Sequence, residues 1–250
     1  MSIPIDLAVI GGTGVYRLPG LQWQDADPGQ TAYGMPSGPI RLAEIEGRRV
    51  AFLARHGEAH SLPPHRVNYR ANLMALRQLG ARRIVAINTV GGITGDYGPR
   101  VLAVPDQLID YTWGRISTFC EEQGSEVLHV DFGDPYTPSL RQELLQACRH
   151  AGVAVVDGGC YGATQGPRLE TRAEISRLRR DGCDLVGMTG MPEAGLAREL
   201  GLSYASLCVV ANWAAGCDDQ HGEITLAEVL ANVESVSAHL LPIISALVKD

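Results

Sequence analysis

Residues 5–14 have the sequence IDLAVIGGTG, in which an apolar run from Ile5 to Ile10 opens directly into a glycine-rich loop at positions 11–14. A short apolar run that ends at glycines is typical of a buried strand followed by a turn. The glycines let a ligand approach the backbone closely, and the Thr13 hydroxyl adds a donor. The loop lacks the lysine of a Walker A motif and does not match G-x-G-x-x-G. By itself it is equally consistent with a plain strand-to-helix turn.

Short strands and helices alternate along the rest of the chain. Thr171 and Thr225 each begin a helix with a capping box, and Pro192 suits the first turn of another. The expected strands are 50–54, 84–87, 153–156, 186–188 and 204–210, and the expected helices are 67–79, 140–150 and a long C-terminal helix kinked at Pro242. This alternation predicts an α/β fold. Since no linker, repeat or low-complexity tract interrupts it, we expect one domain over residues 1–250.

Composition narrows the function classes. The chain has 250 residues, 45% of them hydrophobic, and a formal net charge of -7, which argues against nucleic-acid or anionic-membrane binding. None of the six cysteines forms a C-x-x-C pair, so we expect reduced core thiols. With no signal peptide and no apolar run of membrane-spanning length, a cytoplasmic location is expected.

Polar donors follow several of the predicted strands. Arg55 and His56 end one strand, Thr89 and Val90 follow another, and Thr189 follows the strand that ends at Met188. Arginine offers a bidentate fork to phosphate, and histidine and threonine add single donors. Ligands of α/β folds gather at such strand ends. Together with the loop at 11–14, four strand ends indicate a site for one tetrahedral anion.

Two other interpretations of the histidines carry less weight. His56, His60 and His65 are close in sequence, but no carboxylate or cysteine has matching spacing, so we expect no metal site. Arg55-His56-Gly57 also resembles the start of histidine phosphatases. That alternative leaves the other strand-end donors unexplained. A non-enzymatic nucleotide sensor is a further alternative.

Six short motifs resemble one family, in order and over nearly the whole chain. They are Gly11-Gly12-Thr13-Gly14, Ala54-Arg55-His56-Gly57, Val67-Asn68-Tyr69 with Ala71-Asn72, Gly166-Pro167-Arg168, Met188-Thr189 with Pro192-Glu193, and Tyr204-Ala205-Ser206. The family is that of the trimeric purine nucleoside phosphorylases and methylthioadenosine phosphorylases. The resemblance implies a single α/β domain with a mixed, barrel-like central sheet flanked by helices. It also implies a homotrimer with no metal or organic cofactor, and inorganic phosphate as co-substrate.

The resemblance also assigns roles to individual residues. It implies that phosphate is bound by Thr13, Arg55, His56, Thr89, Val90 and Thr189. It places the purine and ribose against Met188, Leu169, Glu170, Asn212 and Ala214. The phosphate residues coincide with the strand-end donors that the chemistry of the side chains singles out.

Two of these positions distinguish one purine from another. The resemblance places Asn212 and Glu170 where 6-oxopurine enzymes carry the same residues, whereas the methylthioadenosine enzymes carry Asp and Ser. Hypoxanthine presents an N1–H donor to a carboxylate and an O6 acceptor to an amide, and adenine presents the reverse. Each mismatched buried pair costs about 1–3 kcal/mol. The alternatives are that Asn212 is a turn residue and that Glu170 serves the N-terminus of a helix.

The sugar end resembles the methylthioadenosine branch. Leu226 stands where the general enzymes place a histidine near the 5′-hydroxyl, and an apolar residue favours a 5′-methylthio group. His129 resembles a histidine lent across the subunit interface. A 6-oxopurine pocket joined to an alkylthio sugar pocket predicts 5′-methylthioinosine as the substrate. A methylthioadenosine phosphorylase and a general inosine/guanosine phosphorylase remain the alternatives within the family.

Overall fold

The computed structural model describes residues 5–121, 126–218 and 223–249. Within these ranges, Thr13 and Arg17 are described by their backbone alone. The strands are β1 (Leu7–Gly11), β2 (Gln24–Ala26), β3 (Ile40–Ile45), β4 (Arg48–Ala54), β5 (Arg83–Gly92), β6 (Leu102–Val104), β7 (Gln107–Asp110), β8 (Val156–Asp157), β9 (Cys160–Ala163), β10 (Leu185–Gly187) and β11 (Ser203–Trp213). The helices are α1 (Tyr69–Gln78), α2 (Pro138–His150), α3 (Arg172–Arg180), α4 (Gly190–Glu199), α5 (Leu226–Ser237) and α6 (Leu240–Lys249), with 3-10 turns η1 (Thr13–Arg17) and η2 (Pro64–Arg66).

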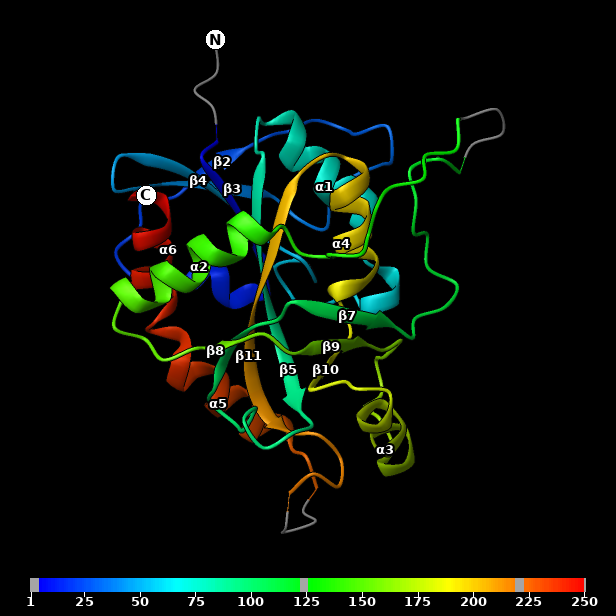
Figure 1. The fold of residues 1–250 in the computed structure, drawn as a ribbon. Coiled ribbons are helices and arrows are strands. Elements are labelled where there is room, and N and C mark those ends of the chain that lie inside the picture. The colour runs from blue at the N-terminus through cyan, green and yellow to red at the C-terminus, as the bar shows by residue number, and fades with distance from the viewer. Residues whose placement is uncertain (1–4, 122–125, 219–222, 250) are drawn as a thin grey trace.

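All eleven strands belong to one mixed sheet that branches at β5. The main path runs β2-β3-β4-β1-β5-β10-β9-β7, and β11 pairs with β5 and leads to β6 and β8. The long strands β5 and β11 lie side by side through the middle of the molecule (Figure 1). β1 and β11 run parallel to β5, whereas β10 is antiparallel to its far end. The expected mixed central sheet flanked by helices is confirmed, and three strands meet at β5.

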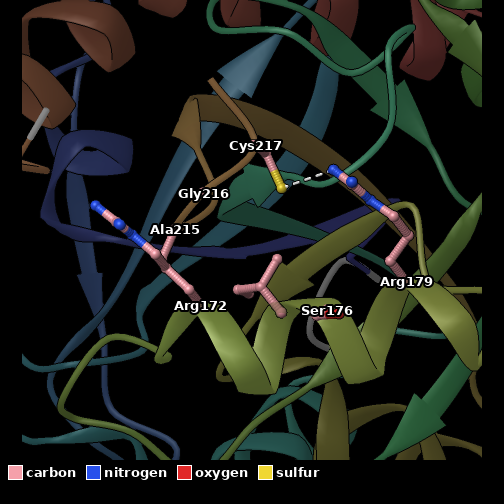
Figure 2. Close-up of a pocket in the computed structure, with 7 residues that line it drawn as sticks. Arg172, Ser176, Arg179, Ala215, Gly216 and Cys217 are labelled. Carbon is pink, nitrogen blue, oxygen red and sulfur yellow. Dashed lines mark hydrogen bonds between the residues drawn. The ribbon is translucent and has the colours of Figure 1, made fainter. Parts of the chain in front are cut away.

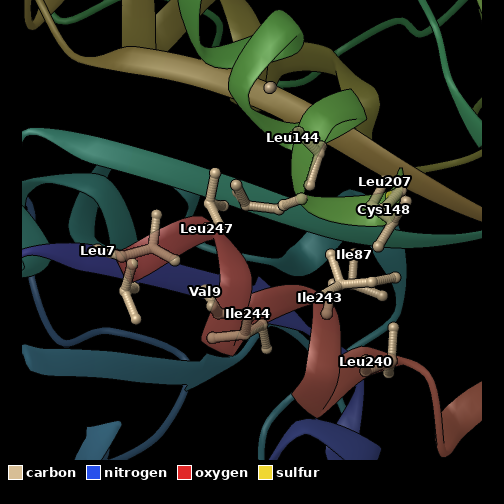
Figure 3. Packing of buried hydrophobic residues seen from close by; sticks show 14 of the residues in the cluster. Leu7, Val9, Ile87, Leu144, Cys148, Leu207, Leu240, Ile243, Ile244 and Leu247 are labelled. Atoms are coloured by element: carbon tan, nitrogen blue, oxygen red, sulfur yellow. The ribbon is translucent and has the colours of Figure 1, made fainter. Parts of the chain in front are cut away.

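Alternate residues of β1 face opposite sides of the sheet, as the period of a strand requires. Leu7 and Val9 pack in one core with α2 and α6, and Ala8 and Ile10 pack in a second core with α1 and α4. Figure 3 shows the first core, in which Leu240, Ile243, Ile244 and Leu247 of α6 meet Leu144 and Cys148 of α2 and the strand residues Leu7, Val9, Ile87 and Leu207. Both faces are therefore covered, and ligands reach only the ends of the strands.

Local sequence signals set most element boundaries. The Asn68 side chain accepts from the Ala71 N–H and starts α1, so this helix is two residues shorter at its N-terminus than predicted. The Thr171 capping box is present in full, and the Thr225 hydroxyl accepts from the Glu228 N–H as expected. Both helices begin where their sequence predicts.

Three predictions about secondary structure are wrong. The strand expected over 84–87 continues as β5 to Gly92, so Thr89 and Val90, which were expected to follow a strand, lie within it and pair with β11. The C-terminal helix is not one helix kinked at Pro242. It consists of α5 and α6, bent by 42°, and the break lies before Pro242, which then sits in the first turns of α6 where its missing N–H costs little. The strand expected over 153–156 is reduced to β8 at Val156–Asp157. Among the described residues no single helix is long and apolar enough to cross a membrane; only α5 and α6 taken together are.

Candidate functional site

The predicted anion ligands lie where β1 and β4 end beside the middle of β5. Gly11 at the end of β1 pairs with Ala54 at the end of β4, and Ile10 pairs with Ala86 of β5. The Arg55 N–H continues this pattern by donating to the Gly11 carbonyl at 2.7 Å. Arg55 and His56 therefore emerge beside the loop at 11–14. The fold brings two of the predicted strand ends together, whereas β5 continues past them to Gly92.

Arg55 and Glu193 form a buried ion pair beneath these strand ends. Their side chains are 2% and 0% exposed, and the contact is bidentate, from Nε to Oε2 at 2.7 Å and from Nη2 to Oε1 at 2.9 Å. Tyr204 donates to the same carboxylate at 2.9 Å. Burial by itself lowers the pKa of the Arg55 guanidinium, but the charge and hydrogen bonds of Glu193 outweigh burial and raise it. Glu193 belongs to one of the six sequence motifs, but the sequence did not predict its ion pair with Arg55.

This pair corrects the interpretation of Arg55 as a bidentate phosphate ligand. Besides Glu193, its guanidinium donates to the carbonyls of Ile87 and Ile10 at 3.3 and 3.5 Å. Because a guanidinium has five N–H groups, these four bonds leave one. The fork is therefore occupied by the protein. A contact between the last N–H and phosphate stays a prediction.

His56 presents one ring nitrogen to the site and uses the other to hold its own loop. Nδ1 lies 2.8 Å from the Leu62 carbonyl, which can only accept, so Nδ1 carries the proton. Burial and, next, the charge of Arg55 lower the pKa of His56 to about 4. At neutral pH the ring is therefore uncharged, with Nε2 as the remaining polar atom.

The expected ligands on β5 and after β10 are neighbours. Antiparallel pairing sets Val186 opposite Gly91, so the residues after β10 run back along β5. Accordingly, the buried Thr189 hydroxyl lies 3.2 Å from Asn88 Oδ1. The Thr189 N–H donates to the Tyr161 hydroxyl at 3.3 Å. Thr189 thus lies beside Asn88, the residue of β5 that precedes the two candidates Thr89 and Val90.

Asn88 is a second residue that sequence reasoning missed. It is buried, and its amide also contacts the Ser206 hydroxyl at 2.8 Å. The next residue, Thr89, is exposed, and Val90 is buried. Asn88 therefore links β5, β11 and the start of α4 directly behind the candidate phosphate ligands. Its only sequence signal was its place before Thr89. For Thr13 the structure gives the backbone alone, at the start of η1.

The candidate purine residue Glu170 is oriented by Thr164. The Thr164 hydroxyl lies 2.5 Å from Glu170 Oε1, and the Thr164 N–H donates to the Gly187 carbonyl at 2.8 Å. Burial raises the pKa of Glu170, and the hydrogen bond from Thr164 partly offsets this. The carboxylate is thus tied to the end of β10, directly before Met188. The capping role considered for Glu170 belongs to Thr171 and Glu174 instead.

Asn212 follows a β-bulge in β11. The register of β11 against β5 shifts between Val210 and Asn212, and Asn232 of α5 donates to the carbonyl of the extra residue, Ala211, at 2.7 Å. A Cβ on Gly91 would lie 3.4 Å from Asn212 Nδ2 and 3.6 Å from the Ala214 Cα. The bulge therefore turns the Asn212 amide and Ala214 toward the β5 edge that also faces Val186.

The remaining candidate residues are one half-buried side chain, Met188, and three that are more exposed, Leu169, Leu226 and His129. Met188 is half-buried, and a Cβ on Gly166 would lie 2.3 Å from its sulfur, so glycine at 166 makes room for this side chain. Leu169 is half-exposed, and Leu226, the first residue of α5, is 71% exposed. His129 is exposed on the segment between β7 and α2, which extends away from the sheet (Figure 1). Within the described part of this chain, neither Leu226 nor His129 is hydrogen-bonded to Arg55, Asn88 or Thr189.

Two other features of the described part of the chain bear on the site. A cavity of about 150 Å³ lies between α3 and the segment after Ala214, lined by Arg172, Ile175, Ser176, Arg179, Ala215, Gly216 and Cys217 (Figure 2). None of the predicted site residues lines it. In Figure 2 the Arg179 guanidinium points at the Cys217 sulfur, 3.0 Å away. No group of three or more metal-ligating side chains occurs among the described residues.

Comparison with known proteins agrees with the motifs. The sequence profile of the Phosphorylase superfamily matches residues 6–249. A protein from Xanthomonas campestris, named probable S-methyl-5′-thioinosine phosphorylase, is 67% identical over 248 residues, 99% of either chain. A probable 6-oxopurine nucleoside phosphorylase from Thermococcus kodakarensis is 45% identical over 215 residues, 84% of this chain and 80% of its own.

A solved structure agrees with the fold. The methylthioadenosine phosphorylase of Schistosoma mansoni in complex with adenine superposes with a TM-score of 0.88 at 30% identity, over 98% of this chain and 91% of its own. The resemblance inferred from the six motifs is confirmed. So is the nucleoside phosphorylase type of fold.

The neutral His56 makes the stability of the protein depend on pH in a defined window. Between the unfolded pKa of about 6.5 and the folded pKa of about 4, the unfolded chain binds the extra proton, so stability falls as pH falls through this range and levels off below it. We expect the difference in free energy of unfolding between wild type and His56→Gln to change in this window and nowhere else from pH 3 to 8. Urea unfolding over that range measures it. A constant difference would contradict the buried, neutral ring.

Proposed function

Because this chain belongs to the Phosphorylase superfamily, we propose that it uses inorganic phosphate to cleave the N-glycosidic bond of a 6-oxopurine nucleoside. The best substrate is 5′-methylthioinosine, and the products are hypoxanthine and 5-methylthioribose 1-phosphate. One observation carries the proposal: the segment after β10 runs back along β5, and the Thr189 hydroxyl lies 3.2 Å from Asn88, the residue before Thr89. This contact supports a phosphate site to which both segments contribute hydroxyl and backbone groups, together with His56, which follows β4 on the other side of β1.

Phosphorolysis needs the phosphate held under the sugar. The sugar becomes positive as the purine leaves, and an oriented phosphate dianion stabilises it while forming the new C–O bond. The phosphate would accept hydrogen bonds from Thr13, Thr89, the backbone of Val90, and Thr189, and the unprotonated Nε2 of His56 would accept the P–OH hydrogen of the dianion. Arg55 would support them from below through its bond to the Ile87 carbonyl. No metal or organic cofactor is required in this proposal, since the phosphate supplies the nucleophile and protein groups supply the orientation.

The purine would lie against Glu170, Asn212 and Ala214. The carboxylate accepts N1–H of hypoxanthine, and the Asn212 amide serves O6 and N7, where negative charge develops on the leaving base. The Asn212 Nδ2 group donates once to the Trp213 carbonyl at 2.7 Å and has a second hydrogen for the base. Met188 would pack beneath the ribose and Leu169 beside the base. The Thermococcus relative, named for 6-oxopurines, agrees with this pocket.

The 5′ group of the substrate would contact residues that a single copy of this chain does not bring to the proposed site. We propose that the protein is a cytoplasmic homotrimer in which Leu226 and a His129 from a neighbouring copy enclose the methylthio group. Large apolar side chains are exposed on the segment before and around His129, which supports an interface there. They are Trp113, Ile116, Val127 and Leu128. The name of the Xanthomonas relative supports the methylthio sugar.

Two alternative activities within the family each differ from the proposed activity in one pocket. A methylthioadenosine phosphorylase shares the sugar pocket, and the Schistosoma structure with adenine shows how far that branch shares the fold. A general inosine/guanosine phosphorylase shares the base pocket. The histidine phosphatase alternative has no support, because the family match covers 6–249 and the Arg55 fork is occupied by Glu193.

A side-by-side assay of methylthioinosine, methylthioadenosine, inosine and adenosine tests the proposal. We expect base release only with phosphate present, and a kcat/KM for methylthioinosine about a thousandfold above that for methylthioadenosine, from two mismatched polar contacts. Comparable efficiency on methylthioadenosine would contradict the roles of Glu170 and Asn212. Higher efficiency on inosine would contradict the role of Leu226. Base release without phosphate would contradict phosphorolysis itself.

The substitution Asn212→Asp tests the base contact separately. A carboxylate accepts from a 6-amino group but repels O6, so the ratio of kcat/KM for methylthioinosine to that for methylthioadenosine is expected to fall by about tenfold or more. Asn68→Asp is the matched control, because aspartate also caps α1 at that position and lies outside the proposed purine pocket. An unchanged ratio in Asn212→Asp would mean that this amide does not face the base.

A further inference from the structure

Arg115 lies between β7 and α2, and its guanidinium is saturated by neutral acceptors. Nη1 donates to the carbonyls of Met188 and Met191, both at 2.7 Å. Nη2 donates to the carbonyls of Thr164 and Gln165 at 3.1 and 2.8 Å, and Nε lies 3.2 Å from Gln165 Oε1. All five N–H groups therefore have a partner.

These acceptors belong to two different loops. Thr164 and Gln165 begin the loop from β9 to α3, which carries Glu170. Met188 and Met191 bracket Thr189 where β10 passes into α4, and Met191 is the second residue of α4. Thr164 is itself the residue that orients Glu170, at 2.5 Å. One side chain from a third segment thus joins the loop of the proposed purine pocket to the loop of the proposed phosphate site.

Arg115 forms no ion pair with a carboxylate among the described residues. Burial lowers its pKa, and the smaller effect of the Asp110 charge acts in the opposite direction. Its positive charge is one of those that lower the pKa of His56, although burial and Arg55 contribute more. The unpaired cation therefore lies close enough to act electrostatically on the proposed phosphate site. Nothing in the sequence around Arg115 signalled this, because the residue has no motif.

We propose that Arg115 is a positioning residue that locks the base-binding loop and the phosphate-binding loop in register, so that the base and the phosphate are held at one fixed separation. The proposal rests on the proposed function for its consequences in catalysis. Its geometry does not, since the clamp exists between the loops themselves. Arginine suits this task because its planar fork presents five donors at fixed angles, whereas the ammonium of lysine offers three on a flexible stem.

The first test is hydrogen exchange in Arg115→Lys. The variant keeps the charge and loses the fork, so we expect faster amide exchange over 164–170 and over 188–191 together. Arg141→Lys is the matched control: this arginine also donates to two carbonyls, of Pro105 at 2.9 Å and Val104 at 3.0 Å, outside both loops. Wild-type exchange in both loops of Arg115→Lys, or faster exchange in one loop alone, would overturn the clamp. This outcome does not depend on any activity.

The second test measures the catalytic efficiency and substrate preference of Arg115→Lys, in which we expect the two loops to be loosened. We expect kcat/KM for methylthioinosine to fall about 10- to 100-fold in Arg115→Lys, because displacements near 1 Å cost that much in positioned reactions. The preference for methylthioinosine over methylthioadenosine should fall as well, since Glu170 is anchored through the clamped loop. Arg141→Lys should keep wild-type values of both. In Arg115→Ala, added guanidinium should restore part of the rate.

A purely structural role predicts a different result. It would lower the thermal stability of Arg115→Lys and Arg141→Lys alike and leave the substrate preference of both unchanged, and that outcome would overturn the proposal. If the wild-type chain released no base, the proposed function would fail. The clamp would then be decided by exchange and by the ratio of hypoxanthine to adenine affinity in calorimetry, which Arg115→Lys should lower and Arg141→Lys should not.

Discussion

The buried pair of Arg55 and Glu193 is the interaction on which the site depends. Two opposite charges with almost no exposed surface are costly to desolvate, and they are stabilised by their bidentate contact and by further hydrogen bonds to each of them. Arg55 reaches carbonyls near the end of β1 and in the middle of β5, and Glu193 brings in α4 and Tyr204 of β11. The pair therefore holds four elements in one relative position. Arg55 forms the floor of the proposed anion site, and the fork it would offer to a ligand is used for that purpose.

Two further polar groups extend this arrangement toward the base. Asn88 connects the floor to Thr189 and to Ser206, and Arg115 connects the phosphate-side loop to the loop of Glu170. Because β5 pairs with β1, β10 and β11, these groups are arranged around one strand. The proposed site thus combines the exposed Thr89 of β5 with the buried Thr189 after β10, and the buried residues Arg55 and Asn88 support them.

Sequence patterns predicted the exposed half of this arrangement better than the buried half. The apolar run at Ile5–Ile10 and the capping threonine at 171 gave local, short-range signals, and the structure has the elements they predict. The motif at Arg55 predicted a bidentate phosphate ligand, yet the partner that occupies its fork is 138 residues away, which no local pattern can indicate. Arg115 has acceptors from two distant loops and no motif of its own. The sequence predicted a kink at Pro242, but the helix breaks before this residue, because α6 packs its own apolar face in the core between α2 and β1.

The most direct measurement of the central claim is the stability and phosphate dependence of Glu193→Gln, which keeps the shape of the side chain and removes its charge. Arg55 would remain buried without a counter-ion, so the account predicts a loss of about 3–5 kcal/mol in the free energy of unfolding. We also expect a raised KM for phosphate, because the ends of β1 and β4 and the middle of β5 lose their common anchor. Glu234→Gln, an exposed glutamate on α5, serves as the matched control. Wild-type stability together with an unchanged KM for phosphate in Glu193→Gln would contradict the account.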